Sequence, residues 1–363
     1  MRGARQQAME LLSMDSWMLV PARFVGLGRT AWRRVAVSGG WRFARGLAWR
    51  WLRCWLLLVS TLPVLQAADS ASSADSVESR LNINYAENTN PRQALDLYLP
   101  KKPRVAGRLP VVVFIHGGGW QNGSKSAGAA WLQPYVASGA YAGVAVGYRL
   151  AGEAPWPAQI YDCKAAIRWI RANAEQAGLN PDKIGVVGNS AGGTLAILLA
   201  ASGGHRALEG EVGSHGRESS LVACVLNYFG RIDFLAEPAE ARAAPEQAKA
   251  LESRLRLLFG GTLAEKTALA RAASPLHYVS AATPPILTMH GTQDALVPYV
   301  QALSLDAAMR RAGAAHLLLP MVGFGHGFQN AEANRRARLF FDLHLRGGSE
   351  AISVEPIVAS PKK

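Results

Sequence analysis

Ser190 lies in the short run 188–192 (GNSAG), between an expected strand and an expected helix. The apolar residues 184–187 precede it, and an apolar helical pattern begins near Gly193. A serine in such a tight strand-to-helix turn exposes its hydroxyl, and flanking glycines avoid clashes with neighbouring backbone. The pattern predicts that Ser190 is a nucleophile at the N-terminus of a helix.

A serine hydroxyl is a weak nucleophile at neutral pH, so it needs a base and a group that fixes the tautomer of that base. His326 follows the expected strand 316–320, and Asp294 follows the expected strand 286–289. Both lie in glycine-containing loops at strand ends. We predict that His326 is the general base and that Asp294 orients it; a turn-forming aspartate and a hydrogen-bonded loop histidine are the alternatives.

Four other titratable side chains compete for these roles. His290 lies nearer its strand end and is expected to be structural, and Asp306 is expected on the solvated face of a helix. Asp233 and His277 border an expected insertion and could contact a substrate. Neither of them has the context of a loop directly after a strand.

The run 116–120 (HGGGW) also follows an expected strand. Acyl transfer passes through a tetrahedral oxyanion, which preorganised backbone N–H groups stabilise. Three glycines let a loop turn its amides inward, so we predict an oxyanion hole formed by Gly118, Gly119 and Ala191. The alternative for the glycines is a flexible turn, and His116 is expected only to brace the loop.

Short apolar runs separated by longer amphipathic segments predict a mostly parallel sheet with helices on both faces. An antiparallel start is expected from strands 81–86 and 94–99, and residues 160–174 predict a crossover helix. The remaining strands are expected at 111–115, 142–147, 184–187, 221–226, 286–289 and 316–320.

The chain organisation is predicted from changes in composition along the sequence. Residues 233–275 are rich in Ala, Glu and Arg and suggest a small helical cap, and 328–345 suggest a closing helix. The expected parts are a basic leader and signal peptide at 1–68, a flexible linker at 69–80, one catalytic domain at 81–348, and a frayed tail at 349–363.

The net charge of +13 is concentrated near the start of the chain. Residues 1–67 hold ten arginines against Glu10 and Asp15, a balance of +8 that leaves +5 for the rest. In that remainder no basic run is interleaved with aromatics, so nucleic-acid binding is not expected. Arginines, the apolar run 55–65 and then Ala67 and Ala68 are typical of a cleaved signal peptide, which predicts a secreted or periplasmic protein without a stable membrane span.

The cysteines do not suggest a metal site. Cys54 lies in the leader, whereas Cys163 and Cys224 lie in apolar patterns that favour buried free thiols, with one disulfide as the alternative. No metal-ligand spacing is present and no cofactor is expected. The oligomeric state stays open.

With these motifs in place, the chain resembles the α/β-hydrolase esterases from about Asn82 to Leu345. It is most similar to the acetylxylan and feruloyl esterase-like group and to the hormone-sensitive-lipase-like group. The first group is favoured by LDLYLP at 95–100, by HGGGW and by GYRL at 147–150. The resemblance implies the chain order Ser, Asp, His and a serine esterase acting on small acyl or sugar-linked esters.

Two departures from the hormone-sensitive-lipase-like pattern weaken the hypothesis of a lipase-like enzyme. Asn189 stands where those enzymes have an aspartate, and the segment 69–80 is too short for their N-terminal helical cap. The alternative hypotheses for the function are a lipase-like carboxylesterase, an amidase or peptidase with the same triad, and a non-enzymatic binding protein. The substrate pockets are expected around Trp120, Trp131 and Trp156, although the last two could equally be core residues.

Overall fold

The structure is a computed structural model that describes residues 76–236 and 245–360. All of these residues belong to the unit Leu65–Lys363. The predicted leader and signal peptide, and most of the predicted linker, lie outside the described residues. The strands are β1 Val77–Asn84, β2 Ala94–Pro100, β3 Leu109–Ile115, β4 Ala142–Val146, β5 Leu179–Asn189, β6 Cys224–Tyr228, β7 Ile286–Gly291, β8 His316–Val322 and β9 Ile357–Val358.

Helices follow most of these strands. The α-helices are α1 Gly128–Val136, α2 Ala158–Ala172, α3 Ala191–Ala201, α4 Arg206–Glu209, α5 Pro245–Phe259, α6 Thr267–Ala273, α7 Val300–Ala312 and α8 Ala331–Arg346, and the short 3₁₀ helices are η2 Lys125–Ala127 and η4 Pro275–Tyr278. The predicted crossover helix is therefore confirmed as α2.

The nine strands found in the described part of the chain form one sheet in the order β1-β2-β4-β3-β5-β6-β7-β8-β9. β1 pairs with β2, and β2 with β4, in antiparallel register, whereas every later pair is parallel. This arrangement confirms the predicted antiparallel start and the mostly parallel α/β sheet. Because the carboxyl ends of parallel strands meet at one edge, the loops after β3, β5, β7 and β8 converge there.

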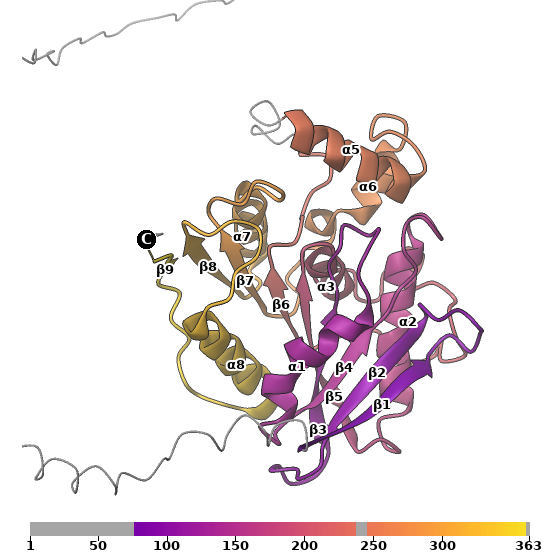
Figure 1. Cartoon of the computed structure of the whole chain (residues 1–363), viewed down its shortest axis with the longest axis vertical. Helices are drawn as coiled ribbons and strands as arrows, with labels where there is room; N and C mark the ends of the chain where they lie inside the picture. Colours follow the sequence, from indigo (N-terminus) through magenta and orange to yellow (C-terminus); the bar gives the residue numbers. More distant parts are fainter. Residues whose placement is uncertain (1–75, 237–244, 361–363) are drawn as a thin grey trace, which may run out of the picture. The chain divides into compact units, whose positions relative to one another are not determined.

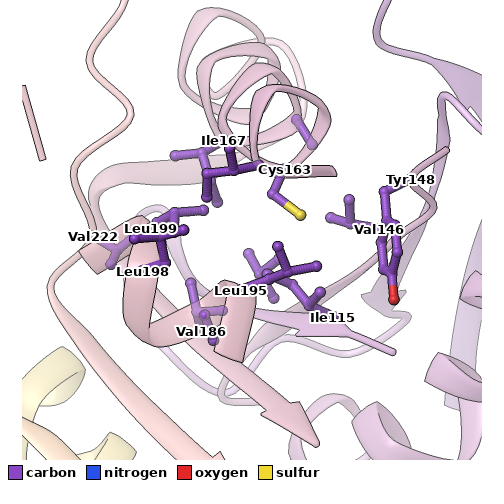
Figure 2. Close-up of a cluster of buried hydrophobic side chains, with 14 of the residues drawn as sticks. Ile115, Val146, Tyr148, Cys163, Ile167, Val186, Leu195, Leu198, Leu199 and Val222 are labelled. Carbon is purple, nitrogen blue, oxygen red and sulfur yellow. The ribbon is translucent and has the colours of Figure 1, made fainter. Parts of the chain in front are cut away.

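Helices cover both faces of the sheet (Figure 1), and two apolar clusters fill the layers between. Residues from α2, α3 and α7 pack on one face, and residues from α1 and α8 pack on the other. In Figure 2, Leu195 and Leu198 of α3 and Ile167 of α2 meet Ile115 and Val186 from the sheet. α3 is buried on nearly all sides, which suits a helix that is apolar all round.

The predicted cap contains α5 and α6, which follow β6 in the chain. In Figure 1 these two helices lie beyond the carboxyl ends of β6, β7 and β8. Leu255, Leu258 and Phe259 of α5 belong to the same apolar cluster as α3. The cap is thus attached to the domain by its own hydrophobic contacts and lies over the edge where the strand-end loops converge.

The first and last parts of the domain differ from the predicted boundaries. β1 begins at Val77, within the expected linker, and its residues 77–80 pair with β2. The expected frayed tail contains β9, which pairs with β8, and the buried Arg336 donates to the carbonyls of Ser353 and Glu355. These tertiary contacts leave no periodic pattern in such short segments, which is why the sequence suggested a linker and a tail.

Strand β6 also differs from its predicted position at 221–226. It runs from Cys224 to Tyr228, and Leu221 is 52% exposed. The carbonyl of Leu221 accepts a hydrogen bond from Arg171 of α2, so this residue belongs to the surface connection before the strand. Leu221 is apolar and lies shortly before the strand, so its residue type alone predicts a strand position that it does not have.

Both cysteines among the described residues are buried free thiols, as predicted. Burial raises the pKa of the Cys163 thiol, whose sulfur lies among apolar side chains in Figure 2. Within residues 76–236 and 245–360 no helix combines the length and apolarity needed to cross a membrane. The same residues contain no cluster of three or more potential metal ligands from His, Cys, Asp and Glu.

Candidate active site

Ser190 occupies a strained turn between β5 and α3. Its φ of 53° and ψ of −121° lie in a region that non-glycine residues rarely adopt. Its N–H donates to the carbonyl of Tyr228 at 2.9 Å, which ties the turn to β6. A β-carbon at Gly188 would lie 2.2 Å from the carbonyl oxygen of Gly192, and one at Gly192 would lie 2.1 Å from that of Ile115. Both flanking glycines are therefore required by close backbone contacts.

The turn also aims a helix at the serine. Ser190 is the N-cap of α3, and Ala191 is its first residue, so the Ala191 N–H has no acceptor inside the helix. The N-terminus of a helix carries a partial positive charge that favours nearby anions. The buried α3 thus brings an unpaired donor and a favourable potential to the position of the Ser190 hydroxyl.

The three residues predicted from separate loops meet at this edge of the sheet. His326 Nε2 lies 2.9 Å from Ser190 Oγ, and His326 Nδ1 lies 2.7 Å from Asp294 Oδ2. Both distances are within hydrogen-bond range. The arrangement lets an imidazole accept the serine proton while a carboxylate holds the imidazole from behind.

Asp294 is held as an anion by its surroundings. Its Oδ1 accepts from the N–H groups of Leu296 and Val297, each at 2.9 Å. Burial raises the pKa of this carboxyl, but hydrogen bonds from His290, His326 and the Val297 N–H outweigh that effect and hold the pKa well below its ordinary value. The carboxylate is therefore charged at neutral pH and available to His326.

His290 has the structural place predicted for it. Its Nε2 lies 2.7 Å from the carbonyl oxygen of Val297 and 3.3 Å from Asp294 Oδ2. The side chain is fully buried, so it braces the loop that carries Asp294. Asp306 differs from its predicted solvated position, because its carboxylate pairs with His316 Nδ1 at 2.9 Å.

The glycine loop, residues 116–120, lies against the serine turn. Gly118 and Gly119 have φ values of +116° and +59°, and the carbonyl of Gly118 accepts hydrogen bonds from Gln121 and Asn122. A β-carbon at Gly118 would lie 2.2 Å from the carbonyl oxygen of Asn122, so only glycine fits this position. The loop is therefore fixed by these contacts, in place of the flexible turn that was the alternative, and it requires glycine at position 118.

Asn189 connects the glycine loop to the serine turn. Its Oδ1 accepts from the Gly117 N–H at 3.0 Å, a role that an aspartate would also fill. The departure from the lipase-like pattern at this position therefore keeps the acceptor that the loop needs.

We expect Asn189→Ala to lower kcat by about tenfold, because the loss of one partly buried hydrogen bond releases the glycine loop. Asn189→Asp should retain most of the activity because its carboxylate still accepts from Gly117. Steady-state kinetics on a short acyl ester would compare the two variants. Equal activity of Asn189→Ala and the parent would show that this contact does not position the loop.

His116 braces the same loop from below. Its Nδ1 lies 2.8 Å from the carbonyl oxygen of Gly117, and its ring stacks on Tyr148, whose hydroxyl donates to the His116 carbonyl. Burial lowers the pKa of His116 to about 4. The histidine is therefore neutral in the folded protein at pH values where it would be protonated in the unfolded chain.

Folding stability should consequently fall between pH 6.5 and pH 4, because only the unfolded chain binds the proton in that range. One such group contributes a slope of up to about 1.4 kcal/mol per pH unit. Urea unfolding at pH 7 and pH 5 should show a smaller pH dependence for His116→Asn than for the parent. Identical dependences would mean that His116 takes up its proton without unfolding.

A cavity of about 410 Å³ opens above Ser190. Its lining contains the three predicted oxyanion donors, Ser190, His326 and the predicted pocket residue Trp120. The other lining residues, which the sequence does not place at a pocket, are Asn122, Asn189, Thr194, Phe229, Arg231, Leu251, Arg254, Leu296, Val297 and Gly327. Most come from the cap or from strand-end loops, whose side-chain directions depend on tertiary packing and leave no motif.

The three tryptophans have different surroundings. Trp120 lines the cavity and packs against Phe234, as expected for a pocket residue. Trp156 is buried in the core, and Trp131 stacks on Phe114 beside a different hollow. Asp233 does not line the cavity either; its Oδ1 accepts from the Leu235 N–H.

Comparison with known proteins identifies the family to which the chain belongs. Residues 95–309, more than half of the chain, match the BD-FAE family model. Esterase LipC of Mycobacterium tuberculosis (strain ATCC 25618 / H37Rv) is 34% identical over 254 residues, which cover 68% of this chain and 59% of LipC. The chain thus spans less than two thirds of the length of that curated relative.

Solved structures of esterases have a similar fold. A truncated carbohydrate esterase from gut microbiota has a TM-score of 0.66 and 28% identity, covering 74% of this chain and 96% of its own. A bifunctional GH43-CE protein of Bacteroides eggerthii has a TM-score of 0.64 and 30% identity, covering 73% of this chain and 38% of its own. The chain therefore belongs to the BD-FAE family and has the α/β-hydrolase fold.

Proposed function

We propose that this protein hydrolyses carboxylic esters through an acyl-enzyme intermediate, with Ser190, His326 and Asp294 as its catalytic triad. The observation that carries the proposal is the chain of two hydrogen bonds, 2.9 Å and 2.7 Å long, that joins these side chains beneath an open cavity. The family match and the esterases among its relatives support the same reaction.

The reaction follows from the position of each group. Ser190 Oγ attacks the ester carbonyl carbon as its proton moves to His326 Nε2, and Asp294 stabilises the resulting imidazolium. The imidazolium then donates its proton to the leaving alcohol oxygen as the C–O bond breaks. Water, deprotonated by the same histidine, attacks the acyl-enzyme and releases the carboxylic acid and the free serine.

The oxyanion of each tetrahedral intermediate is assigned to the N–H groups of Gly118, Gly119 and Ala191. All three residues line the cavity beside Ser190, and the glycine loop is fixed by the contacts of Gly117 and Gly118. Preorganised donors of this kind are worth about 100-fold or more in kcat each.

The proposed substrates are small acyl or sugar-linked esters of the acetyl or feruloyl type. The BD-FAE match, the carbohydrate esterase among the structural neighbours and the modest cavity volume favour this class. A lipase-like carboxylesterase is the second candidate, since the relative LipC is named as an esterase with no sugar-linked substrate in its name.

A substrate panel separates the two candidates. Acetylated xylan, methyl ferulate and p-nitrophenyl esters with acyl chains of increasing length would be assayed side by side. We expect the highest kcat/KM on acetyl or feruloyl esters and a steep loss with longer chains. A rise in kcat/KM toward long acyl chains would favour the lipase-like candidate.

We also infer that the protein is exported, from the basic and apolar pattern of residues 42–68. N-terminal sequencing of the protein recovered from the periplasm or the medium should begin near Ala68 or Asp69. Recovery of the uncleaved chain from the cytosol alone would contradict export.

A further inference from the structure

Two arginines line the cavity that contains Ser190. Arg231 lies in the loop after β6, and Arg254 lies on α5 of the cap. A β-carbon at Gly119 would lie 3.2 Å from Arg254 Cδ, so this side chain reaches from the cap to the glycine loop. The guanidinium groups of two separate elements thus approach the position of the reacting ester.

Arg231 is 3% exposed, and among the described residues its one hydrogen bond runs from Nη2 to the Leu296 carbonyl at 3.5 Å. The other buried arginines of the described chain have carboxylate partners. Arg168 lies 3.2 Å from Glu209, and Arg336 lies 2.8 Å from Glu332. Burying a charge without a partner is costly, so the unpaired Arg231 at the cavity indicates a place for an anionic ligand.

No aspartate or glutamate among the described residues lines this cavity or forms an ion pair with either arginine. Burial lowers the pKa of Arg231 to about 10, against smaller opposing effects of the charges of Asp294 and Asp233, which do not contact it. Both carboxylates already accept hydrogen bonds from other groups. Arg231 therefore stays cationic at neutral pH, with an unfilled capacity for an anion.

We propose that Arg231 and Arg254 form a subsite for a carboxylate carried by the ester substrate. A guanidinium presents paired N–H donors that match the two oxygens of a carboxylate. The subsite would select anionic esters over neutral esters of the same shape. This inference rests on the proposed function, since it concerns the substrate of the same serine.

The test compares matched pairs of esters in which a carboxylate is replaced by its primary amide. 4-Acetoxybenzoate and 4-acetoxybenzamide place the group on the alcohol side, and phenyl hydrogen glutarate and its amide place it on the acyl side. The measured quantity is the ratio of kcat/KM for the acid over the amide. The parent should favour the acid in at least one pair, and the pair that does so identifies the side on which the carboxylate binds.

Arg231→Gln and Arg254→Gln should each lower that ratio by at least about tenfold, as expected for loss of a hydrogen bond to a charged group. Arg254→Lys should recover part of it. Arg256→Gln is the matched control, because Arg256 lies on the same helix, is exposed and pairs with Glu252. Its ratio should equal that of the parent.

The possible failures are distinct. If Arg231 only supports the charge of Asp294, the Arg231→Gln variant loses activity equally on the acid and on the amide. An unchanged acid-to-amide ratio of kcat/KM in both arginine variants overturns the subsite. A parent without preference for either acid overturns it as well. If the parent hydrolyses none of the four esters or the substrate panel, the proposed function itself fails.

Discussion

Ser190→Ala should lower the hydrolysis of short acyl esters by about 10⁴-fold or more, as removal of the serine nucleophile does in characterised Ser-His-Asp enzymes. The methyl side chain leaves the strained turn, the Tyr228 contact and the glycine loop unchanged. It removes only the oxygen that lies 2.9 Å from His326 Nε2. Initial rates with p-nitrophenyl acetate measure the effect.

Ser202→Ala provides the matched control for this loss. Ser202 is a buried serine at the other end of α3, and its hydroxyl donates to the Leu198 carbonyl. We expect its activity to stay within a few-fold of the parent value once the folded fraction is taken into account. Parent-like hydrolysis by a folded Ser190→Ala protein would end the assignment of the nucleophile.

Asp294→Asn should lower kcat by about 10⁴-fold, because it changes the tautomer of His326. The asparagine oxygen can keep the bonds from the Leu296 and Val297 N–H groups, which leaves its NH₂ facing His326 Nδ1. The imidazole would then carry its proton on Nε2, toward Ser190, and could not accept the serine proton. The measurement is kcat for the parent and the variant over a range of pH.

Asp306→Asn tests whether this effect belongs to the site. Asp306 pairs with His316 Nδ1 at 2.9 Å, a partly buried Asp–His contact that lies outside the cavity. Its variant should lose stability but retain nearly parental kcat. Equal losses of kcat in Asp294→Asn and Asp306→Asn would indicate that both substitutions act through folding and not through the site.

The residues around Ser190 were predictable because their local patterns have few alternatives. A serine between glycines, after an apolar strand and before an apolar helix, fits a turn in which Gly188 and Gly192 are required by backbone contacts. Asp294 and His326 follow strands that proved to be parallel neighbours, β7 and β8. The parallel sheet brings such loops to one edge, so strand assignments were enough to bring the three side chains together.

Other features depend on contacts between distant segments and have no local signature. Asp306 looked solvated on its helix, but the start of β8 places His316 beside it. β9 pairs only two residues with β8, too few for a periodic pattern. Arg231 reads as an ordinary loop residue until the fold buries it without a carboxylate partner.

Intact-protein mass spectrometry after treatment with a fluorophosphonate most directly tests whether Ser190 is an activated nucleophile. We expect one covalent adduct per chain, located by peptide mapping to the GNSAG segment, and none on the Ser190→Ala protein. Because activation requires the His326 contact, a folded His326→Ala protein should label far more slowly. An adduct at another residue, or ester hydrolysis by a parent protein that resists labelling, would contradict the proposed mechanism.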